Sequence, residues 1–243
     1  QVEVFTTAIG AGTDVIDKEM YTLKTKGGDH LALRPEHTAG TMRAYLEHGM
    51  QSLPQPVLMY HSGPVFRHEN PQKGRYRQFT GFDLDVYGSE KSIIDALVMR
   101  TAYTILQESG ASNLSIDINS IGDRDCRPKY IRELTNYFKK HSKDLPAVDR
   151  ERLANNPLRI LDSKDPKTIA LCADAPAMTD YLCADCKKHF REVISYLDQM
   201  SIPYTINKNL VRGLSYYTRT VFEIMEQVEN DDGTTRKLTI CGG

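Results

Sequence analysis

Two groups of strand-like segments are separated in this sequence by a long helix-like block, residues 123–200. Before the block, 19–34 and 55–87 each show two short runs of alternating apolar and polar residues around a turn, and 114–119 shows a single run. After the block, 204–240 returns to strand character. This order predicts an α+β fold in which an antiparallel sheet is flanked by helices and carries a helical insertion.

The same pattern predicts three segments along the chain. Residues 1–122 form the first part of a core domain, 123–200 form the helical insertion, and 201–243 continue the core. Helical periodicity predicts helices over 38–49, 92–109, 127–142, 147–155 and 176–200. In the first of them, Ala39, Met42 and Leu46 share one predicted apolar face.

Composition limits the class of protein. The formal net charge is -1 and 40% of residues are hydrophobic, which is typical of a globular protein with a buried core and without a general affinity for nucleic acid. The sequence has no signal-peptide pattern and no apolar run near the roughly 18 residues of a membrane span. Five cysteines, an odd number, do not suggest a disulfide framework. We therefore expect a cytoplasmic protein with no membrane partner.

The densest chemical signal is the segment 63–88, predicted as strand, loop and strand. Its basic residues are Arg67, His68, Lys73, Arg75 and Arg77. Guanidinium groups held over a sheet can bind oligophosphate through paired hydrogen bonds, and Phe79 on the returning strand offers a ring on which a base can stack. A solvated basic hairpin is the alternative interpretation.

Two further segments contain candidate ligand-binding groups. In 210–223, Arg212 precedes two adjacent tyrosines and could offset negative charge at a reacting phosphate, although a structural arginine in a strand is the alternative. In 33–40, Glu36 could face a ligand ammonium. Thr38 in the same segment could be the N-cap of the following helix.

Three stretches, taken together, resemble signatures of the histidyl-tRNA synthetases in the order found in that family. FRHENPQKGRYRQF is similar to motif 2 of class II synthetases in its histidine-specific form. LVRGLSYYTRTVFE resembles the histidine-specific signature LVRGLDYY-R-VFE, and LRPEHTAG resembles the LRPEGTAG stretch that holds the amino acid. The resemblance covers nearly the whole chain. It implies ATP-dependent activation of histidine to histidyl-adenylate and transfer of histidine to tRNA(His).

The resemblance implies a role for each matching residue. Arg67 and Arg212 would act on the reacting α-phosphate as catalytic residues. The residues implied for ATP are Arg67, Glu69, Arg75 and Phe79. The residues implied for histidine are Glu36, Thr38, Arg67, Gly81, Asp85, Arg212, Tyr216 and Tyr217. ATP would bind together with Mg²⁺, and no metal is expected as a fixed part of this site.

The sequence departs from the family pattern around the implied histidine site. Gly81 stands where the family has a glutamine that helps hold the substrate ammonium, and His37 stands where glycine is usual. Ser215 replaces an aspartate, and Asp85 is a glutamate in many bacterial members. Because glycine offers no carbonyl side chain, we expect Gly81 to weaken histidine binding and Gly81→Gln to strengthen it.

The resemblance also leaves alternatives. Motif 1, motif 3 and the anticodon-binding domain of the family are expected outside these residues, and the full-length protein is expected to be a homodimer. A non-catalytic relative is the alternative, either the regulatory subunit of ATP phosphoribosyltransferase or a synthetase-like domain that senses tRNA. Motif 2 is usually degraded in the regulatory subunit, whereas RHENPQKGRYR is intact here, which favours the enzyme.

One cysteine pair does not belong to these signatures. Cys183 and Cys186 have the C-x2-C spacing that suits zinc, and Cys172 and His189 lie nearby in the sequence. A single C-x2-C on a predicted helix, without obvious partner ligands, favours thiols that pack between helices over a zinc site.

Overall fold

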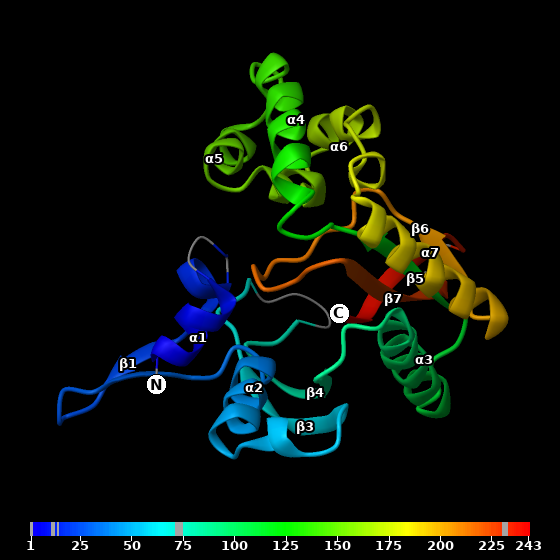
Figure 1. The fold of residues 1–243 in the computed structure, drawn as a ribbon. Coiled ribbons are helices and arrows are strands. Elements are labelled where there is room, and N and C mark those ends of the chain that lie inside the picture. Colours follow the sequence, from blue (N-terminus) through cyan, green and yellow to red (C-terminus); the bar gives the residue numbers. More distant parts are fainter. Residues whose placement is uncertain (1, 11–12, 14, 71–74, 230–232) are drawn as a thin grey trace. The chain divides into compact units, whose positions relative to one another are not determined.

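The computed structural model describes residues 2–10, 13, 15–70, 75–229 and 233–243. Lys73 of the basic segment and residues 230–232 of the predicted final turn lie outside the described residues. The chain forms two compact units (Figure 1). Unit 1 contains residues 1–90 and 213–216, and unit 2 contains residues 91–212 and 217–243.

Unit 1 is built from short helices and two hairpins. Its elements are α1 (Val2–Ile9), a π-helical turn (Val15–Glu19), β1 (Thr22–Lys24), β2 (His30–Ala32), α2 (Thr38–Glu47), a 3-10 turn (Met50–Ser52), β3 (Val57–Phe66) and β4 (Gln78–Tyr87). Strands β1 and β2 pair antiparallel, as the sequence predicts. Strands β3 and β4 form the second predicted hairpin, and all ten residues of each strand are paired. Helix α1 was not predicted; Phe5 and Ile9 of α1 are buried in a small apolar cluster with Val15 and Ala39.

Helix α2 forms where predicted, but only Ala39 of its predicted apolar face is buried. Met42 and Leu46 are 40% and 53% exposed, whereas the buried residues of α2 are Ala39, Thr41 and Tyr45. The ring of Tyr45 stacks on that of Tyr87 with centroids 4.9 Å apart. Contacts with strand β4, both aromatic and polar, therefore decide the orientation of the helix, and its apolar spacing does not.

Unit 2 contains a four-stranded sheet and most of the helices. Its elements are α3 (Ser92–Glu108), β5 (Leu114–Ser120), α4 (Arg127–Lys140), α5 (Ala147–Asn155), a 3-10 segment (Pro157–Asp162), α6 (Pro166–Ala173), a 3-10 turn (Met178–Asp180), α7 (Ala184–Gln199), β6 (Tyr204–Ile206), β7 (Thr220–Glu229) and β8 (Thr235–Gly242). The strand order is β6-β5-β7-β8. Strand β5 pairs antiparallel with β7 and β7 with β8, while the short strand β6 joins β5 in parallel.

One face of this sheet is covered by α3 and α7. Ile116 and Ile118 of β5 alternate with polar residues and are fully buried, and Ile224 of β7 lies opposite Ile116. They pack in one cluster with Met99 of α3 and Val193 of α7. The amphipathic helix predicted at 92–109 is therefore confirmed as a layer on the sheet.

A second apolar cluster holds the helices between β5 and α7. Tyr130, Leu134 and Phe138, four residues apart on α4, are fully buried and meet Ile160 and Cys172. Within residues 123–200, the helices before α7 pack together in this cluster, and most of α7 packs on the sheet.

Two helix predictions in this region were wrong in detail. Helix α7 begins at Ala184 rather than near 176, because Cys183 caps its first turn by accepting a hydrogen bond from the amide of Cys186. Helix α6 was missed, although Asp165 before Pro166 is an ordinary start signal and its carboxylate accepts from two backbone amides. No helix in the described part of the chain has both the length and the apolar character to cross a membrane.

Candidate active site

One face of the β3–β4 hairpin carries the implied ligand groups of unit 1 in a row. Side chains alternate along a strand, so Phe79, Gly81, Asp83 and Asp85 share a face of β4. Their cross-strand partners on β3 are, in the same order, Val65, Gly63, His61 and Met59. The row has an aromatic end, a gap at the paired glycines, and an acidic end. Two side chains of the row, those of Phe79 and Asp85, were candidates from the sequence, and the alternation of β4 adds Asp83.

At the aromatic end, Arg67 lies over Phe79. The guanidinium carbon is 5.5 Å from the ring centroid, so the two side chains share one face of the hairpin. Arg67 Nε donates to the carbonyl of Pro35 at 2.8 Å, which fixes the side chain against the segment before α2. In the loop, Arg75 donates to Glu69 across 3.3 Å. A planar cation and an aromatic face are thereby placed together, a combination suited to an anion attached to a base.

At the acidic end, hydroxyl groups of α2 hold Asp85. The Thr38 hydroxyl donates to one carboxylate oxygen of Asp85 at 3.1 Å, and the Thr41 hydroxyl donates to the other at 2.7 Å. Thr41 also bonds to the hydroxyl of Tyr87. Thr38 is therefore not an N-cap: it is the first residue of the helix, and its hydroxyl is used by Asp85.

Glu36 takes part in starting the helix. One oxygen of its carboxylate accepts from the amide of Ala39 at 2.8 Å, and the residue is only 7% exposed. Burial raises the pKa of the Glu36 carboxyl, and the nearby charges of Asp83 and Asp85 raise it further. A buried carboxylate beside two others is an unfavourable arrangement unless a cation joins it. The acidic end is thus suited to an ammonium group.

His37 lies over the paired glycines between the two ends. A Cβ built on Gly81 would be 3.2 Å from Cε1 of His37, and one built on Gly63 would be 3.9 Å from its Nε2. Nδ1 of His37 bonds to Asp83, so the lone pair of a neutral ring is on Nε2. That atom is buried and has no hydrogen-bond partner among the described residues. The centroid of the His61 ring is 4.1 Å from that of His37. The pKa of His61 is lowered, mainly by burial and to a smaller extent by its electrostatic interaction with His37.

In unit 2, Arg212 is held by an ion pair. Its Nη1 lies 2.8 Å from Glu223 Oε1, and its guanidinium carbon is 5.5 Å from the ring centroid of Tyr217. Gly242 on β8 leaves room for it, since a Cβ there would lie 2.7 Å from Nη1. Nε of Arg212 is buried and lacks a hydrogen-bond partner within the described ranges. A buried N–H of this kind is available to a ligand oxygen.

Two side chains missed by the sequence analysis hold the backbone around Arg212 and Tyr217. The amide of Asn119 donates to the carbonyl of Leu210 at 3.0 Å, and Arg127 donates to the carbonyl of Tyr217 at 2.8 Å. Both contacts join residues about ninety positions apart, so no local pattern indicated them.

The implied site residues divide between the two units. Those in unit 1 are Glu36, Thr38, Arg67, Glu69, Arg75, Phe79, Gly81, Asp85 and Tyr216, and those in unit 2 are Arg212 and Tyr217. Ser215, which stands at an aspartate position of the family, uses its hydroxyl and amide on the carbonyl of Ile9 within unit 1. Joint action of Arg67 and Arg212 stays a prediction.

Comparison with known proteins gives a consistent result. The sequence model of the tRNA synthetase class II core domain (G, H, P, S and T) matches residues 21–238. A histidine--tRNA ligase of Desulforamulus reducens is 47% identical over 225 residues, covering 93% of this chain and 54% of that protein. The chain therefore spans about half the length of the curated relatives it matches.

Solved structures agree in fold. The apo histidyl-tRNA synthetase of S. aureus matches 100% of this chain and 58% of its own, with a TM-score of 0.71 and 36% identity. A Bacillus halodurans C protein described as ATP phosphoribosyltransferase regulatory subunit/histidyl-tRNA synthetase matches 98% of this chain and 63% of its own, with a TM-score of 0.55. Its 18% identity shows likeness of fold alone.

Proposed function

Because the chain belongs to the class II tRNA synthetases, in the histidyl-tRNA synthetase family, we propose that it carries the site where ATP activates histidine. In this reaction the histidine carboxylate attacks the α-phosphorus of ATP, and pyrophosphate leaves. Histidine then passes from the adenylate to a terminal hydroxyl of tRNA(His). By the same resemblance, we propose homodimerisation and a cytoplasmic location for the full-length protein.

The row on β4 is the observation that carries this proposal. From Phe79 to Asp85 the strand advances roughly 20 Å, at about 3.3 Å per residue. One end offers an arginine over an aromatic ring, and the other offers the carboxylates of Asp83 and Asp85 near the buried Glu36. A ligand with a base, a phosphate and an ammonium along its length, such as an aminoacyl-adenylate, has complementary groups in the same order.

At the ATP end, each residue has a role that its contacts support. Phe79 stacks on adenine, and Arg67 holds the α-phosphate, where a guanidinium can make two parallel hydrogen bonds. Glu69 meets the adenine edge and Arg75 reaches the outer phosphates. Their present ion pair has a distance of 3.3 Å, with Arg75 largely exposed, and an exposed pair of this kind contributes little stability. Breaking the Glu69–Arg75 ion pair to form contacts with ATP therefore costs little free energy.

At the amino-acid end, Glu36 and Thr38 hold the α-ammonium of histidine. Glu36 supplies negative charge that burial leaves poorly solvated, so an incoming ammonium relieves an unfavourable state. From the family resemblance, Asp85, Tyr216 and Tyr217 are proposed as the residues that recognise the imidazole. The hydroxyl groups of Thr38 and Thr41 keep the Asp85 carboxylate in place.

Arg212 is proposed as the second arginine on the reacting phosphate. Adenylation concentrates negative charge at one phosphorus, so fixed cations lower its barrier without covalent catalysis. Glu223 orients the guanidinium of Arg212, while Nε of Arg212 stays available to a phosphate oxygen. Mg²⁺ enters as the counter-ion of the ATP phosphates, because magnesium is commonly held through substrate phosphates.

Histidine-dependent exchange between ATP and labelled pyrophosphate tests this function. Exchange that needs histidine and is not supported by other amino acids is expected. The alternative is a non-catalytic relative that senses histidine or uncharged tRNA. It predicts histidine or tRNA binding without exchange, both in this chain and in a full-length protein containing it. That outcome would overturn the proposal.

A further inference from the structure

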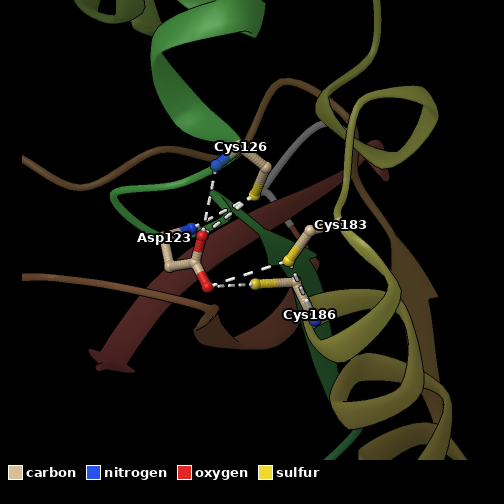
Figure 2. A group of neighbouring side chains, drawn as sticks. All are labelled: Asp123, Cys126, Cys183 and Cys186. Carbon is tan, nitrogen blue, oxygen red and sulfur yellow. Dashed lines mark hydrogen bonds between the residues drawn. The ribbon is translucent and has the colours of Figure 1, made fainter.

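Four potential metal ligands from two distant parts of unit 2 converge at one point. They are Asp123, Cys126, Cys183 and Cys186, and one ligand atom from each lies within 4.8 Å of the others. Figure 2 shows their side chains pointing toward one another, from the loop before α4 and from the start of α7. None of the four belongs to the residues implied for ATP or histidine.

From this cluster we propose a structural zinc site with three cysteine ligands and one aspartate ligand. Tetrahedral Zn²⁺ with Zn–S bonds of about 2.3 Å places its sulfur ligands roughly 3.8 Å apart. Oδ1 of Asp123 already lies 3.3 Å from Cys126 Sγ, and its Oδ2 lies 3.0 Å from Cys186 Sγ and 3.8 Å from Cys183 Sγ. The four groups need shifts of only about an ångström to coordinate one ion. Thiolate and carboxylate donors also suit zinc.

Backbone amides donate hydrogen bonds to two of the sulfur atoms in the cluster. The amide of Cys186 donates to Cys183 Sγ at 3.4 Å, and the amide of Asp123 donates to Cys126 Sγ at 3.4 Å. Cys183 is the N-cap of the 16-residue α7, and Cys126 is the N-cap of the 14-residue α4. Helix N-termini favour negative charge, so both helices would help to stabilise the thiolates of a zinc-bound cluster.

The surroundings of the cluster add a positive charge and a close fit. Arg127 donates to the carbonyls of Ile121 and Gly122, directly before Asp123, so its guanidinium offsets the negative ligand set. Gly122 has φ +62, and a Cβ there would lie 2.7 Å from Cys126 Sγ. Glycine is thus required for the loop to bring Asp123 and Cys126 together.

The other cysteine and histidine named with this pair in the sequence analysis do not take part. The Cys172 thiol bonds to the carbonyl of Ile160 inside the helical cluster, and His189 pairs with Asp95 at 2.7 Å. In the sequence alone, the C-x2-C pair has no obvious partners, which favours thiols that pack between helices. Asp123 and Cys126, about sixty residues earlier, are those partners.

The position of the cluster indicates what the ion would do. Asp123 and Cys126 stand where the chain leaves β5, and Cys183 and Cys186 stand where it enters α7. The ion would therefore link the start of α4 to the start of α7, the two points at which the helical cluster containing α4, α5 and α6 begins and ends. With four protein ligands and no open position, it is structural rather than catalytic. Each thiol releases its proton to solvent when the ion binds.

Metal content and cobalt substitution of the purified chain test the site. We expect one zinc per chain after exposure to Zn²⁺ and gel filtration. With Co²⁺ instead, we expect the visible bands of tetrahedral cobalt and a cobalt–thiolate charge-transfer band. Less than about a tenth of a metal ion per chain, or a Cys183–Cys186 disulfide in place of metal, would overturn the proposal. This measurement on the unmodified chain decides the matter even if a variant fails to fold.

Matched cysteine variants locate the ion. Cys126→Ser and Cys186→Ser should each lose the zinc and the charge-transfer band, whereas Cys172→Ser and Cys241→Ser should keep both. Asp123→Asn should weaken zinc binding and leave the cobalt–thiolate band visible at higher Co²⁺. Full zinc retention by Cys186→Ser, or equal loss in the two control variants, would contradict the four-ligand assignment. In the unmodified chain, chelation should lower the Tm and speed amide exchange at the starts of α4 and α7.

Discussion

His37 occupies the space into which a side chain at position 81 would extend. A Cβ on Gly81 would lie 3.2 Å from Cε1 of His37 and 3.0 Å from Cγ2 of Val65. The family resemblance places glycine at 37 and glutamine at 81. In this chain the large side chain of the contact is at position 37 and the glycine is at position 81, the reverse of the family pattern. The expectation that Gly81→Gln alone would strengthen histidine binding therefore has to be replaced.

We predict that Gly81→Gln lowers both thermal stability and histidine affinity while His37 is present. Overpacking of this kind typically costs about 1–3 kcal/mol. The double variant with His37→Gly should recover most of both losses, giving a coupling free energy of at least about 1 kcal/mol in a double-mutant cycle. Calorimetry of unfolding and of histidine binding measures it. Gly40→Gln, on an open helix surface, is the control, and additive effects of the two changes would contradict the contact.

Arg67→Lys should lower the kcat of ATP–pyrophosphate exchange by about 100-fold or more, since lysine cannot replace a two-point guanidinium contact with a phosphate. Arg43→Lys, in an exposed pair with Glu47, is a matched control and should leave exchange unchanged. Steady-state kinetics at saturating histidine make the comparison. A loss of less than threefold in kcat for Arg67→Lys would show that Arg67 does not contact the reacting phosphate.

Phe79→Leu should raise the KM for ATP about tenfold and leave the KM for histidine nearly unchanged. Stacking of a base on an aromatic ring is worth about 1–3 kcal/mol, and leucine keeps the apolar volume without the ring. The measurement is exchange kinetics with each substrate varied in turn. Equal increases in both KM values would mean that Phe79 supports the hairpin rather than the base.

Glu223→Gln should reduce the kcat of exchange about tenfold with little change in either KM, because it removes the charge that orients Arg212. Combined with Arg212→Lys, its effect should be much less than additive. Glu226→Gln on the same strand is the control, since Glu226 accepts from the amide of Ser112 instead. If the two single effects simply add, Glu223 acts independently of Arg212.

Glu36→Gln should raise the Tm of the ligand-free chain at neutral pH. Burial raises the pKa of Glu36 above its ordinary 4.5, so the folded state holds this proton more tightly than the unfolded state. Stability from the protonated form is fully present below pH 4.5 and is lost as pH rises through the higher folded pKa. The difference in Tm should therefore grow from pH 4 to pH 7, while histidine binding by the variant is lost. Glu47→Gln, exposed at the end of α2, should show no such trend. A Tm difference that stays constant with pH would contradict the raised pKa of Glu36.

Much of unit 1 follows from local sequence patterns. The β3–β4 hairpin and the start of α2 were predicted, because alternation and turn residues act over a few neighbouring positions. The same alternation by itself orders Phe79, Gly81 and Asp85 on one face of their strand. The β5 strand and the α3 helix were predicted for the same reason.

Only the tertiary structure decided which distant groups meet. Local periodicity could not show that Thr41, rather than Met42, faces strand β4, because that choice depends on Asp85 and Tyr87 more than forty residues away. Nor could it show that His37 fills the gap at Gly81, or that Asp123 and Cys126 join Cys183 and Cys186. Periodicity reports which face of an element is apolar. The partner of that face is set by packing between elements, which is a property of the whole folded chain.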